Sequence, residues 1–234
     1  MSQQLLFLFQ HNPTYTCVEF KKIKRMKKIN QIGPIPTYTL CIINGPNQIA
    51  YYPLVQLVDN FVWQNQINVA IGELARELID LQVGNMPTTV EEMIGLYEIK
   101  NNQRQVLSLS ISNYTYHFQA AHGMTYIKSL TFDMKEEKIC SLADLFKPDS
   151  NYVEVISKLV KEQIEERDIP LLGEFTQIQP NQDFYIADKT LVIYFQLYEI
   201  SPYVVGFPMF PISVFDLESI INENGPLARM AVNN

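Results

Sequence analysis

The chain has 234 residues, of which 47% are apolar and 18% charged, with 13 Tyr, 13 Phe and only nine Gly. This composition predicts an ordered globular protein with a sizeable core and excludes a low-complexity or disordered chain. The net charge of −7 is uneven, because residues 1–28 hold six Lys or Arg and one Glu, a local charge of +5, so that the rest carries −12. An acidic body argues against a nucleic-acid partner, since phosphate contacts need a basic surface.

The first apolar stretch is LLFLF, which comprises Leu5, Leu6, Phe7, Leu8 and Phe9. No Lys or Arg precedes it, it is only five residues long, and no small-residue cleavage site follows, so it does not fit a signal peptide. No later stretch approaches the ~20 apolar residues of a membrane span. We therefore expect synthesis in the cytoplasm without a signal peptide. Residues 1–36 are interpreted as an N-terminal arm with a basic linker.

Strand and helix patterns begin after this arm. The stretches TYTLCII and IAYYPLV flank a turn cluster at residues 44–47, which predicts a hairpin. A long amphipathic helix is predicted from about Val58 to Leu81, with Gly84 at its end and an apolar stripe formed by Ile67, Ile71, Leu74, Leu78 and Leu81. Ile94–Lys100 and Gln105–Tyr116 form a second predicted hairpin. Residues 107–112 alternate between apolar residues and Ser, so one face should be buried and the other wet or covered by a partner.

The second half repeats this alternation of strands and one helix. Thr125–Met134 is a predicted strand, and a helix capped by Asn151 should run to Glu165. A hairpin is expected around residues 187–189, then a strand at PISVF and a short closing helix at Asp216–Ile221. The prediction is an α+β fold with mostly antiparallel sheet and two long helices. We divide it into a first half at 37–118, a second half at 119–222 and a tail at 223–234.

Six motifs resemble a known family of paired domains in Firmicutes. They are YYP (Tyr51–Pro53), QNQIN (Gln64–Asn68), SLTFDM (Ser129–Met134), LADLF (Leu142–Phe146), FYIADKTLVIYF (Phe184–Phe195) and YEISPY (Tyr198–Tyr203). The family resembled forms the extracellular part of lysozyme-sensing anti-sigma factors and also accompanies peptidoglycan deacetylase domains. The resemblance covers about residues 37–222, and it departs at Gln119 and Ala120, where the family usually has glycines.

The resemblance carries expectations about function. Anti-sigma members have a sigma-binding segment and a membrane span before these domains, and this sequence shows neither, so direct regulation of a sigma factor is not expected. In the deacetylases the chemistry belongs to another domain. The sequence is most similar to short, leaderless members from spore-forming bacilli. We therefore expect a non-enzymatic, self-assembling structural protein, deposited on the spore surface or in a mother-cell inclusion. The alternative is a binding module for lysozyme-like proteins or cell-wall glycan.

Catalytic and metal-binding residues are sparse. The three cysteines (Cys17, Cys41, Cys140) and three histidines form no CxxC or zinc-site spacing, and we expect no metal and no cofactor. His122 is the strongest candidate for a chemical site, which leaves a hydrolase as a distant alternative. A general base needs an orienting carboxylate, however, and none is indicated, so a structural histidine is favoured.

Two regions are candidate contact sites. The region richest in aromatic residues, together with His122, is a candidate partner groove; the alternative is a tyrosine-rich sheet interior. Its named members are Tyr185, Tyr194, Tyr198, Glu199, Tyr203 and His122. The arm residues Leu5–Phe9 and Cys17 are the candidates for self-assembly, either by pairing with their own sheet edge or by adding a strand to a neighbour. The basic run that follows is a solvated connector, a membrane or nucleic-acid contact, or a contact with another copy's acidic surface.

Overall fold

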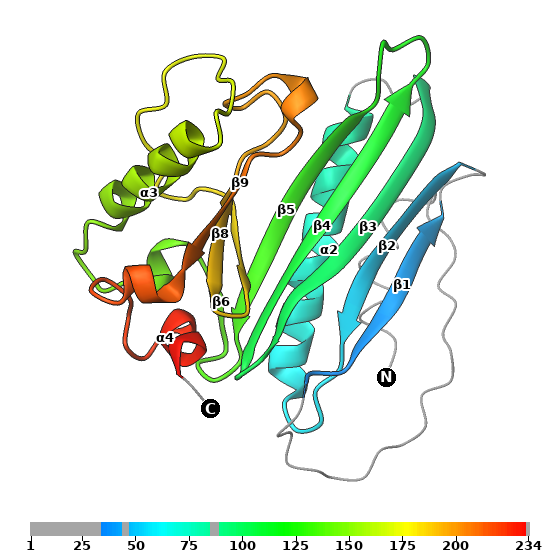
Figure 1. Ribbon diagram of the computed structural model, residues 1–234. Coiled ribbons are helices and arrows are strands. Elements are labelled where there is room, and N and C mark those ends of the chain that lie inside the picture. The colour runs from blue at the N-terminus through cyan, green and yellow to red at the C-terminus, as the bar shows by residue number, and fades with distance from the viewer. Residues whose placement is uncertain (1–33, 44–46, 85–88, 233–234) are drawn as a thin grey trace. The chain divides into compact units, whose positions relative to one another are not determined.

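The protein is represented by a computed structural model that describes residues 34–43, 47–84 and 89–232 (Figure 1). The predicted arm, including Leu5–Phe9 and Cys17, lies outside the described residues. Six strands are ordered β1-β2-β3-β4-β5-β6 in one sheet, and three are ordered β7-β8-β9 in a second. Most pairs are antiparallel and the described residues include three α-helices, so the predicted α+β class is confirmed.

The chain forms two compact units. Among the described residues, unit 1 comprises Pro36–Tyr97, apart from 44–46 and 85–88, and Ile111–Thr125. Unit 2 comprises Glu98–Ser110 and residues 126–232, with the short stretch before Pro36. The long strands β3 (Val90–Gln103) and β4 (Val106–His117) contribute residues to both. A boundary between independently folding halves at residue 118 stays a prediction.

Unit 1 begins with the predicted hairpin. Strands β1 (Thr37–Ile43) and β2 (Gln48–Val55) are antiparallel, with Cys41 opposite Tyr51. Strand β2 then pairs in parallel with β3, and Ala50 lies opposite Gly95. The local sequence did not predict this parallel pairing, because it joins segments more than forty residues apart.

Helix α2 (Phe61–Val83) covers one face of these strands. It begins where Asn60 Oδ1 accepts a hydrogen bond from Trp63 N and ends at Gly84, whose φ of 51° suits glycine. Four residues of the predicted stripe are buried, whereas Leu81 is exposed, so the prediction for that residue was wrong. The 100° step per residue carries Leu81 off the buried face, where Gln82 takes the last inward position.

The QNQIN motif has a structural role in this unit. Asn68 of α2 accepts a hydrogen bond from Val55 N at 2.8 Å and donates one to Val55 O at 2.9 Å. One turn earlier, Gln64 Oε1 accepts from Leu57 N at 2.8 Å. The two amide side chains therefore satisfy the backbone where β2 ends, and they fix the helix against the strand.

Unit 2 is built on β5 (Met124–Asp133), the short β6 (Lys138–Cys140) and the second sheet. In that sheet the predicted hairpin of β7 (Phe184–Ala187) and β8 (Thr190–Tyr194) is confirmed, and β9 (Met209–Ser213) completes it with β8 in the centre. Helix α3 (Tyr152–Glu166) buries Ile156, Val160 and Ile164 in the core of this unit.

Three local predictions for this unit need correction. Asn151 precedes α3 but makes no capping hydrogen bond, since its amide donates to Glu154 Oε2 instead. The closing helix expected at Asp216–Ile221 is a 3₁₀ turn at Val214–Leu217. The last helix, α4 (Pro226–Ala231), lies in what the sequence suggested was a tail, and Pro226 at its first turn is a common start signal.

The serine face of β4 is buried rather than wet. Ser108 Oγ lies 2.8 Å from Thr131 Oγ1 and accepts a hydrogen bond from Ile186 N at 3.0 Å. The alternating pattern correctly predicts two different faces. It does not reveal that the second sheet of the same chain covers the polar face, because small hydroxyls are tolerated in a core when they are bonded.

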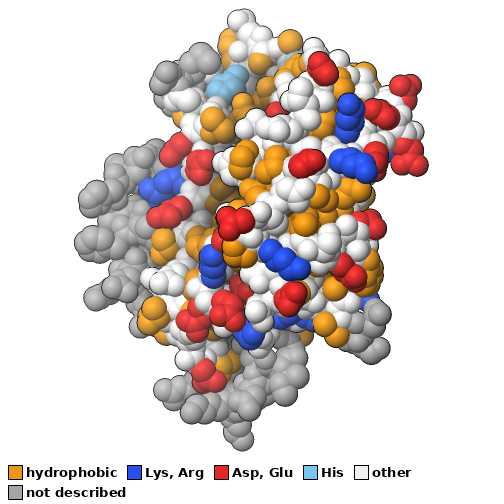
Figure 2. Space-filling view, turned by 90° about the vertical axis from the view of Figure 1, so that its left-hand side faces the viewer, with side chains coloured by type: hydrophobic (Ala, Val, Ile, Leu, Met, Phe, Trp, Pro, Cys, Tyr) orange, Lys and Arg blue, Asp and Glu red, His pale blue; other side chains and the backbone are white. Residues whose placement is uncertain are grey.

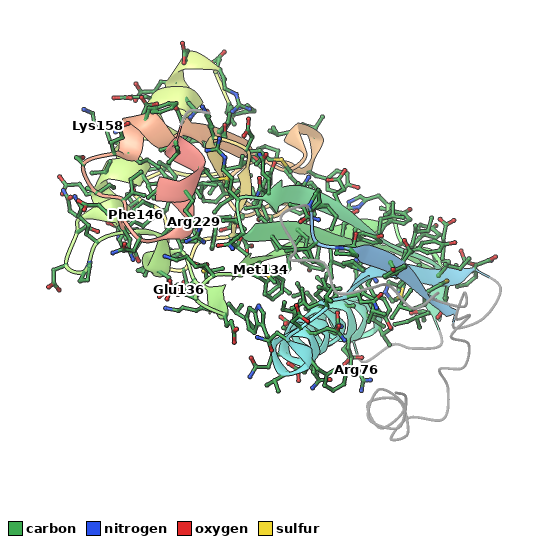
Figure 3. All side chains as sticks on the ribbon, turned by 90° about the horizontal axis from the view of Figure 1, so that it is seen from below. Arg76, Met134, Glu136, Phe146, Lys158 and Arg229 are labelled. Atoms are coloured by element: carbon green, nitrogen blue, oxygen red, sulfur yellow. The ribbon has the colours of Figure 1, made fainter. Side chains whose placement is uncertain are left out.

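Helix α4 is held by charged side chains, among them Arg229, which is labelled in Figure 3. Arg229 Nη2 lies 2.6 Å from Asp133 Oδ1, and both side chains are largely buried. Arg104 Nη1 donates hydrogen bonds to the carbonyl oxygens of Arg229 at 2.9 Å and Met230 at 3.1 Å. A guanidinium group thus caps the C-terminal end of the helix, where carbonyl groups lack intrahelical partners.

Candidate partner-binding loop

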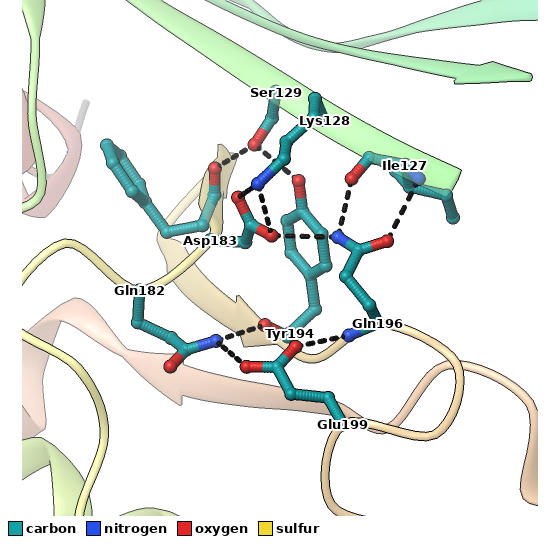
Figure 4. Close-up of polar contacts among 9 residues, drawn as sticks. Ile127, Lys128, Ser129, Gln182, Asp183, Tyr194, Gln196 and Glu199 are labelled. Atoms are coloured by element: carbon teal, nitrogen blue, oxygen red, sulfur yellow. Dashed lines mark hydrogen bonds and ion pairs between the residues drawn. The ribbon is translucent and has the colours of Figure 1, made fainter. Parts of the chain in front are cut away.

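The loop at residues 196–208 connects β8 to β9 and is anchored by a polar network (Figure 4). Gln196 Nε2 donates to Ile127 O at 2.6 Å and to Asp183 Oδ2 at 2.7 Å, and Gln196 Oε1 accepts from Ile127 N at 3.1 Å. Asp183 also pairs with Lys128, whose Nζ lies 2.9 Å from Oδ1. These contacts fix the start of the loop to strand β5.

Glu199 holds the next turn of the loop. Its Oε2 accepts a hydrogen bond from Gln196 N at 2.6 Å, and its Oε1 accepts from Gln182 Nε2 at 3.1 Å. Gln182 also donates to Tyr194 O. Both carboxylate oxygens are therefore engaged with the protein, which makes Glu199 a turn anchor rather than an acid or base poised for chemistry.

Tyr194 lies inside this network and is fully buried. Its hydroxyl is 2.8 Å from Ser129 Oγ, which also donates to Phe184 O. Burial, and next the neighbouring Asp183, raise the pKa of Tyr194 well above its ordinary value. The phenol stays protonated at neutral pH and serves to join the second sheet to β5.

The outer part of the loop presents apolar side chains to solvent. Val204, in the 3₁₀ turn Tyr203–Val205, is 89% exposed, and Tyr198 is 46% exposed. The rings of Tyr198 and Tyr203 lie 5.6 Å apart and form a tilted pair. Tyr198 has a φ of 65°, a left-handed conformation that is uncommon for a non-glycine residue and is held here by the Glu199 anchor.

A small cavity adjoins this surface. It measures about 230 Å³ and lies between the loop and the segment after α3, where Leu172 N donates to Ile200 O at 2.9 Å. Its lining mixes the rings of Phe175 and Phe195 with polar groups from Gln177 and Glu199. A cavity of this size and mixed chemistry suits one small side chain or part of a sugar ring.

The predicted groove residues do not all reach one accessible surface. Tyr198 and Tyr203 are together on the loop with Glu199 beneath them, whereas Tyr185 and Tyr194 are buried side by side, with ring centroids 5.9 Å apart. His122 belongs to unit 1, is exposed, and has Nδ1 2.9 Å from Gly123 O. A shared role for the six residues stays a prediction. The sequence did not lead us to predict exposed positions at Val204 and Leu172. For Val204 there was a signal, because an apolar residue between Pro202 and Gly206 lies in a turn-rich segment that is expected at the surface.

The other described histidine with a defined environment is structural. His117 Nε2 lies 2.9 Å from Gln82 O and its Nδ1 lies 2.7 Å from Thr89 Oγ1. Because a carbonyl only accepts, Nε2 must carry the proton. Both ring nitrogens are thereby engaged, so His117 links α2 to β4 rather than acting on a substrate.

The described part of the chain shows no sign of a metal site or a membrane span. Among these residues, no group of three or more His, Cys, Asp or Glu side chains is arranged to hold a metal ion. No described helix is both long and apolar enough to cross a membrane. Figure 2 shows acidic and basic side chains intermingled on one face, with apolar side chains between them. No large area of a single charge is visible on that face.

These features define the class of the protein: it is an α+β protein with two sheets and an exposed apolar loop. Residues 143–214, which include the loop, match the family described as "Protein of unknown function (DUF3298)". A DUF3298 family structure from Bacteroides fragilis superposes with a TM-score of 0.63 at 14% identity, covering 86% of this chain and 98% of that one. A second, from Pseudomonas aeruginosa, gives 0.61 at 15% identity, covering 87% and 99%. These likenesses show the fold.

Two curated proteins of Bacillus subtilis are also similar. The anti-sigma-V factor RsiV is 36% identical over 39% of this chain and 36% of its own length. The peptidoglycan-N-acetylmuramic acid deacetylase PdaC is 25% identical over 54% of this chain and 28% of its own length. The chain thus spans about a third of the relatives it matches, and the resemblance predicted from the six motifs is confirmed.

Proposed function

We propose that this protein is a non-enzymatic binding module whose loop at residues 196–208 recognises a lysozyme-like protein. The similarity to the anti-sigma-V factor RsiV supports this class of function. The family that the six sequence motifs resemble includes lysozyme-sensing anti-sigma factors. The observation that carries the proposal is a loop, fixed by hydrogen bonds, that holds exposed Val204 and Tyr198 beside half-buried Tyr203.

The physical argument concerns the entropy of binding. Tyrosine rings are among the side chains that carry most of the binding energy at protein interfaces when they fill a pocket on the partner. An exposed aliphatic side chain such as Val204 adds apolar area that is removed from water on binding. A loop that is already ordered loses less conformational freedom on binding than a mobile one. Glu174 and Glu199 line the adjoining cavity, and their charge favours a basic partner, as lysozymes are.

The test is a titration of the full chain with lysozyme at about 0.3 M salt, where the Debye length is well below 10 Å and weak charge attraction is screened. Val204→Asp should reduce affinity at least tenfold. The matched control is Val62→Asp on α2, because Val62 is similarly exposed, at 70%, and should bind as the unchanged protein does. Binding that disappears at this salt concentration in every variant would contradict specific recognition.

Cell-wall glycan is the alternative partner for the same loop. The cavity supports it, because aromatic rings beside amide and carboxylate groups can hold a sugar. Soluble peptidoglycan fragments should then bind the full chain and protect the loop amides, and Tyr203→Ala should weaken that binding. Binding of lysozyme without binding of these fragments would favour the protein partner.

The proposal includes the absence of catalysis by this chain. A hydrolase centred on His122 would need a carboxylate or metal to activate the imidazole. Turnover of glycan, ester or peptide substrates that His122→Ala abolishes, with the fold intact, would overturn this part of the proposal.

Self-association is a second candidate function, favoured by the charge distribution of the sequence. The basic segment at residues 21–28 precedes a body that carries −12, so the arm of one copy and the body of another attract each other. Leu5–Phe9 would supply apolar contact. As this second candidate function, we propose that the protein forms a homo-oligomer that builds a spore-associated layer or a mother-cell inclusion.

A further inference from the structure

Sheet edges expose unpaired backbone groups, and in unit 2 the protein covers or shortens them. Edge strand β6 has only three residues and a charged turn before it. Serine side chains satisfy backbone groups on the outer edge of strand β7. Ile186 N donates to Ser108 Oγ, and Ser129 Oγ donates to Phe184 O. These are the devices by which proteins prevent association through sheet edges.

Edge strand β9 is covered by helix α3. Gln163 Nε2 donates to Pro211 O at 2.9 Å, and Arg167 Nη1 donates to Met209 O at 2.8 Å. Pro211 itself has no N–H group to leave unpaired. Side chains therefore satisfy backbone groups on both edges of the small sheet.

Among the described residues, strand β1 in unit 1 shows none of these devices. Within the described residues it has one neighbouring strand, β2, with which all seven of its residues are in register. Its sequence, TYTLCII, contains no charged residue and no proline. A long, uncharged edge of this kind readily accepts another strand.

A segment that suits this edge occurs earlier in the same chain. Pro36–Thr39, which leads into β1, reads PTYT, and Pro13–Thr16 reads PTYT as well. Each copy continues with strand-forming residues, Leu-Cys-Ile-Ile after the second and Cys-Val-Glu-Phe after the first. The segment Thr14–Phe20 thus begins with the same three residues as β1 and continues, like β1, with mostly apolar ones.

We propose that Thr14–Phe20 pairs antiparallel with β1 of its own chain as an additional edge strand. The connector at residues 21–36 has a root-mean-square span of about 20 Å if flexible, which corresponds to a millimolar effective concentration of the segment. A second copy at micromolar concentration competes poorly with a tethered strand. The antiparallel direction places Phe20 beside Thr37. The two ends of the connector therefore lie on neighbouring strands, and the connector does not have to span the length of the sheet.

This inference goes beyond the proposed loop function and is compatible with self-association. Leu5–Phe9 precedes the added strand and would lie outside it, available to another copy. The oligomeric state therefore reports on self-association, whereas the protection of β1 amides reports on the added strand.

The test is residue-resolved amide hydrogen exchange on the full chain, with solution mass measured in parallel. In the unchanged protein every second amide of β1, those pointing away from β2, should be protected. Thr16→Pro with Val18→Pro removes donors and disfavours a strand, so these amides should exchange at least tenfold faster. The control carries the same two prolines at Lys24 and Met26 in the connector and should retain the protection.

Two results would overturn the proposal. Equal exchange at these β1 amides with and without the segment prolines would show that Thr14–Phe20 does not pair there. Protection that appears only in a dimer, and is lost on dilution to monomer, would assign the edge to a second copy instead of the same chain.

Discussion

At the scale of single residues, Gly95 illustrates how closely β2 and β3 approach. A Cβ added at this position would lie 2.6 Å from Ala50 Cβ and 2.9 Å from Ala50 Cα. Because Ala50 Cα is backbone, the strands would have to separate, and we expect Gly95→Ala to lower the free energy of unfolding by about 1–3 kcal/mol in urea denaturation.

Gly72 provides the matched control for that substitution. It lies in α2, and a Cβ there meets no atom within 4 Å. Gly72→Ala should therefore raise the free energy of unfolding, by up to about 1 kcal/mol, since alanine is the better helix former. If both variants change stability in the same direction, the close approach at Gly95 is not the determining factor.

Buried tyrosines predict the response to alkaline pH. Burial raises the pKa of Tyr52 to about 12, and burial with Asp183 raises that of Tyr194 further. Below pH 10.0, the ordinary value, both the folded and unfolded forms are protonated. Above it the unfolded form ionises first, so stability falls as pH rises. Tyr194→Phe should show a shallower fall above this pH, measured as urea unfolding at successive pH values; an unchanged slope would contradict the assignment.

At the scale of secondary-structure elements, the Arg229–Asp133 ion pair should decide whether α4 stays docked. Replacing Arg229 with Met leaves the carboxylate of Asp133, only 4% exposed, without its cation. Loss of one partner of a buried pair costs about 3–5 kcal/mol. We expect Arg229→Met to destabilise unit 2 by about this amount in chemical denaturation, and to release the α4 amides to exchange.

The control for this prediction is Lys158→Met. Lys158 on α3 forms an exposed pair with Glu162 at 3.9 Å, and such pairs contribute about 0.5 kcal/mol or less. Its effect should be correspondingly small. Equal losses in the two variants would mean that burial of the Arg229 pair is unimportant for stability.

The elements that the sequence predicted well are those with local signals. Turn residues located the hairpins of β1–β2 and β7–β8, and Gly84 located the end of α2. The parallel pairing of β2 with β3 and the covering of the Ser108 face depend on residues distant in sequence. For the candidate site, tyrosine content indicated the region, but only tertiary packing separates exposed Tyr198 from buried Tyr194.

At the scale of the whole molecule, self-association should depend on Leu5–Phe9. Burying these side chains against a partner removes several hundred Å² of apolar surface, about 10 kcal/mol before the comparable costs of association. Leu6→Asp with Leu8→Asp, or Phe7→Asp with Phe9→Asp, should therefore yield a folded monomer with an unchanged melting transition, as measured by light scattering and calorimetry. The two pairs test which strand face is buried.

The same experiment has two contradicting outcomes. An oligomer that persists in both double variants would show that Leu5–Phe9 is not the assembly element. A variant that unfolds would instead make this stretch an ordinary strand of its own domain.

The binding function itself is tested most directly by mapping the contact surface in solution. Amide exchange of the full chain, with and without lysozyme at about 0.3 M salt, reports which residues become protected. The account predicts protection concentrated in residues 198–206 and at Leu172, with α2 unchanged around Val62. Protection elsewhere in the chain, with this loop unaffected while lysozyme is bound, would contradict it.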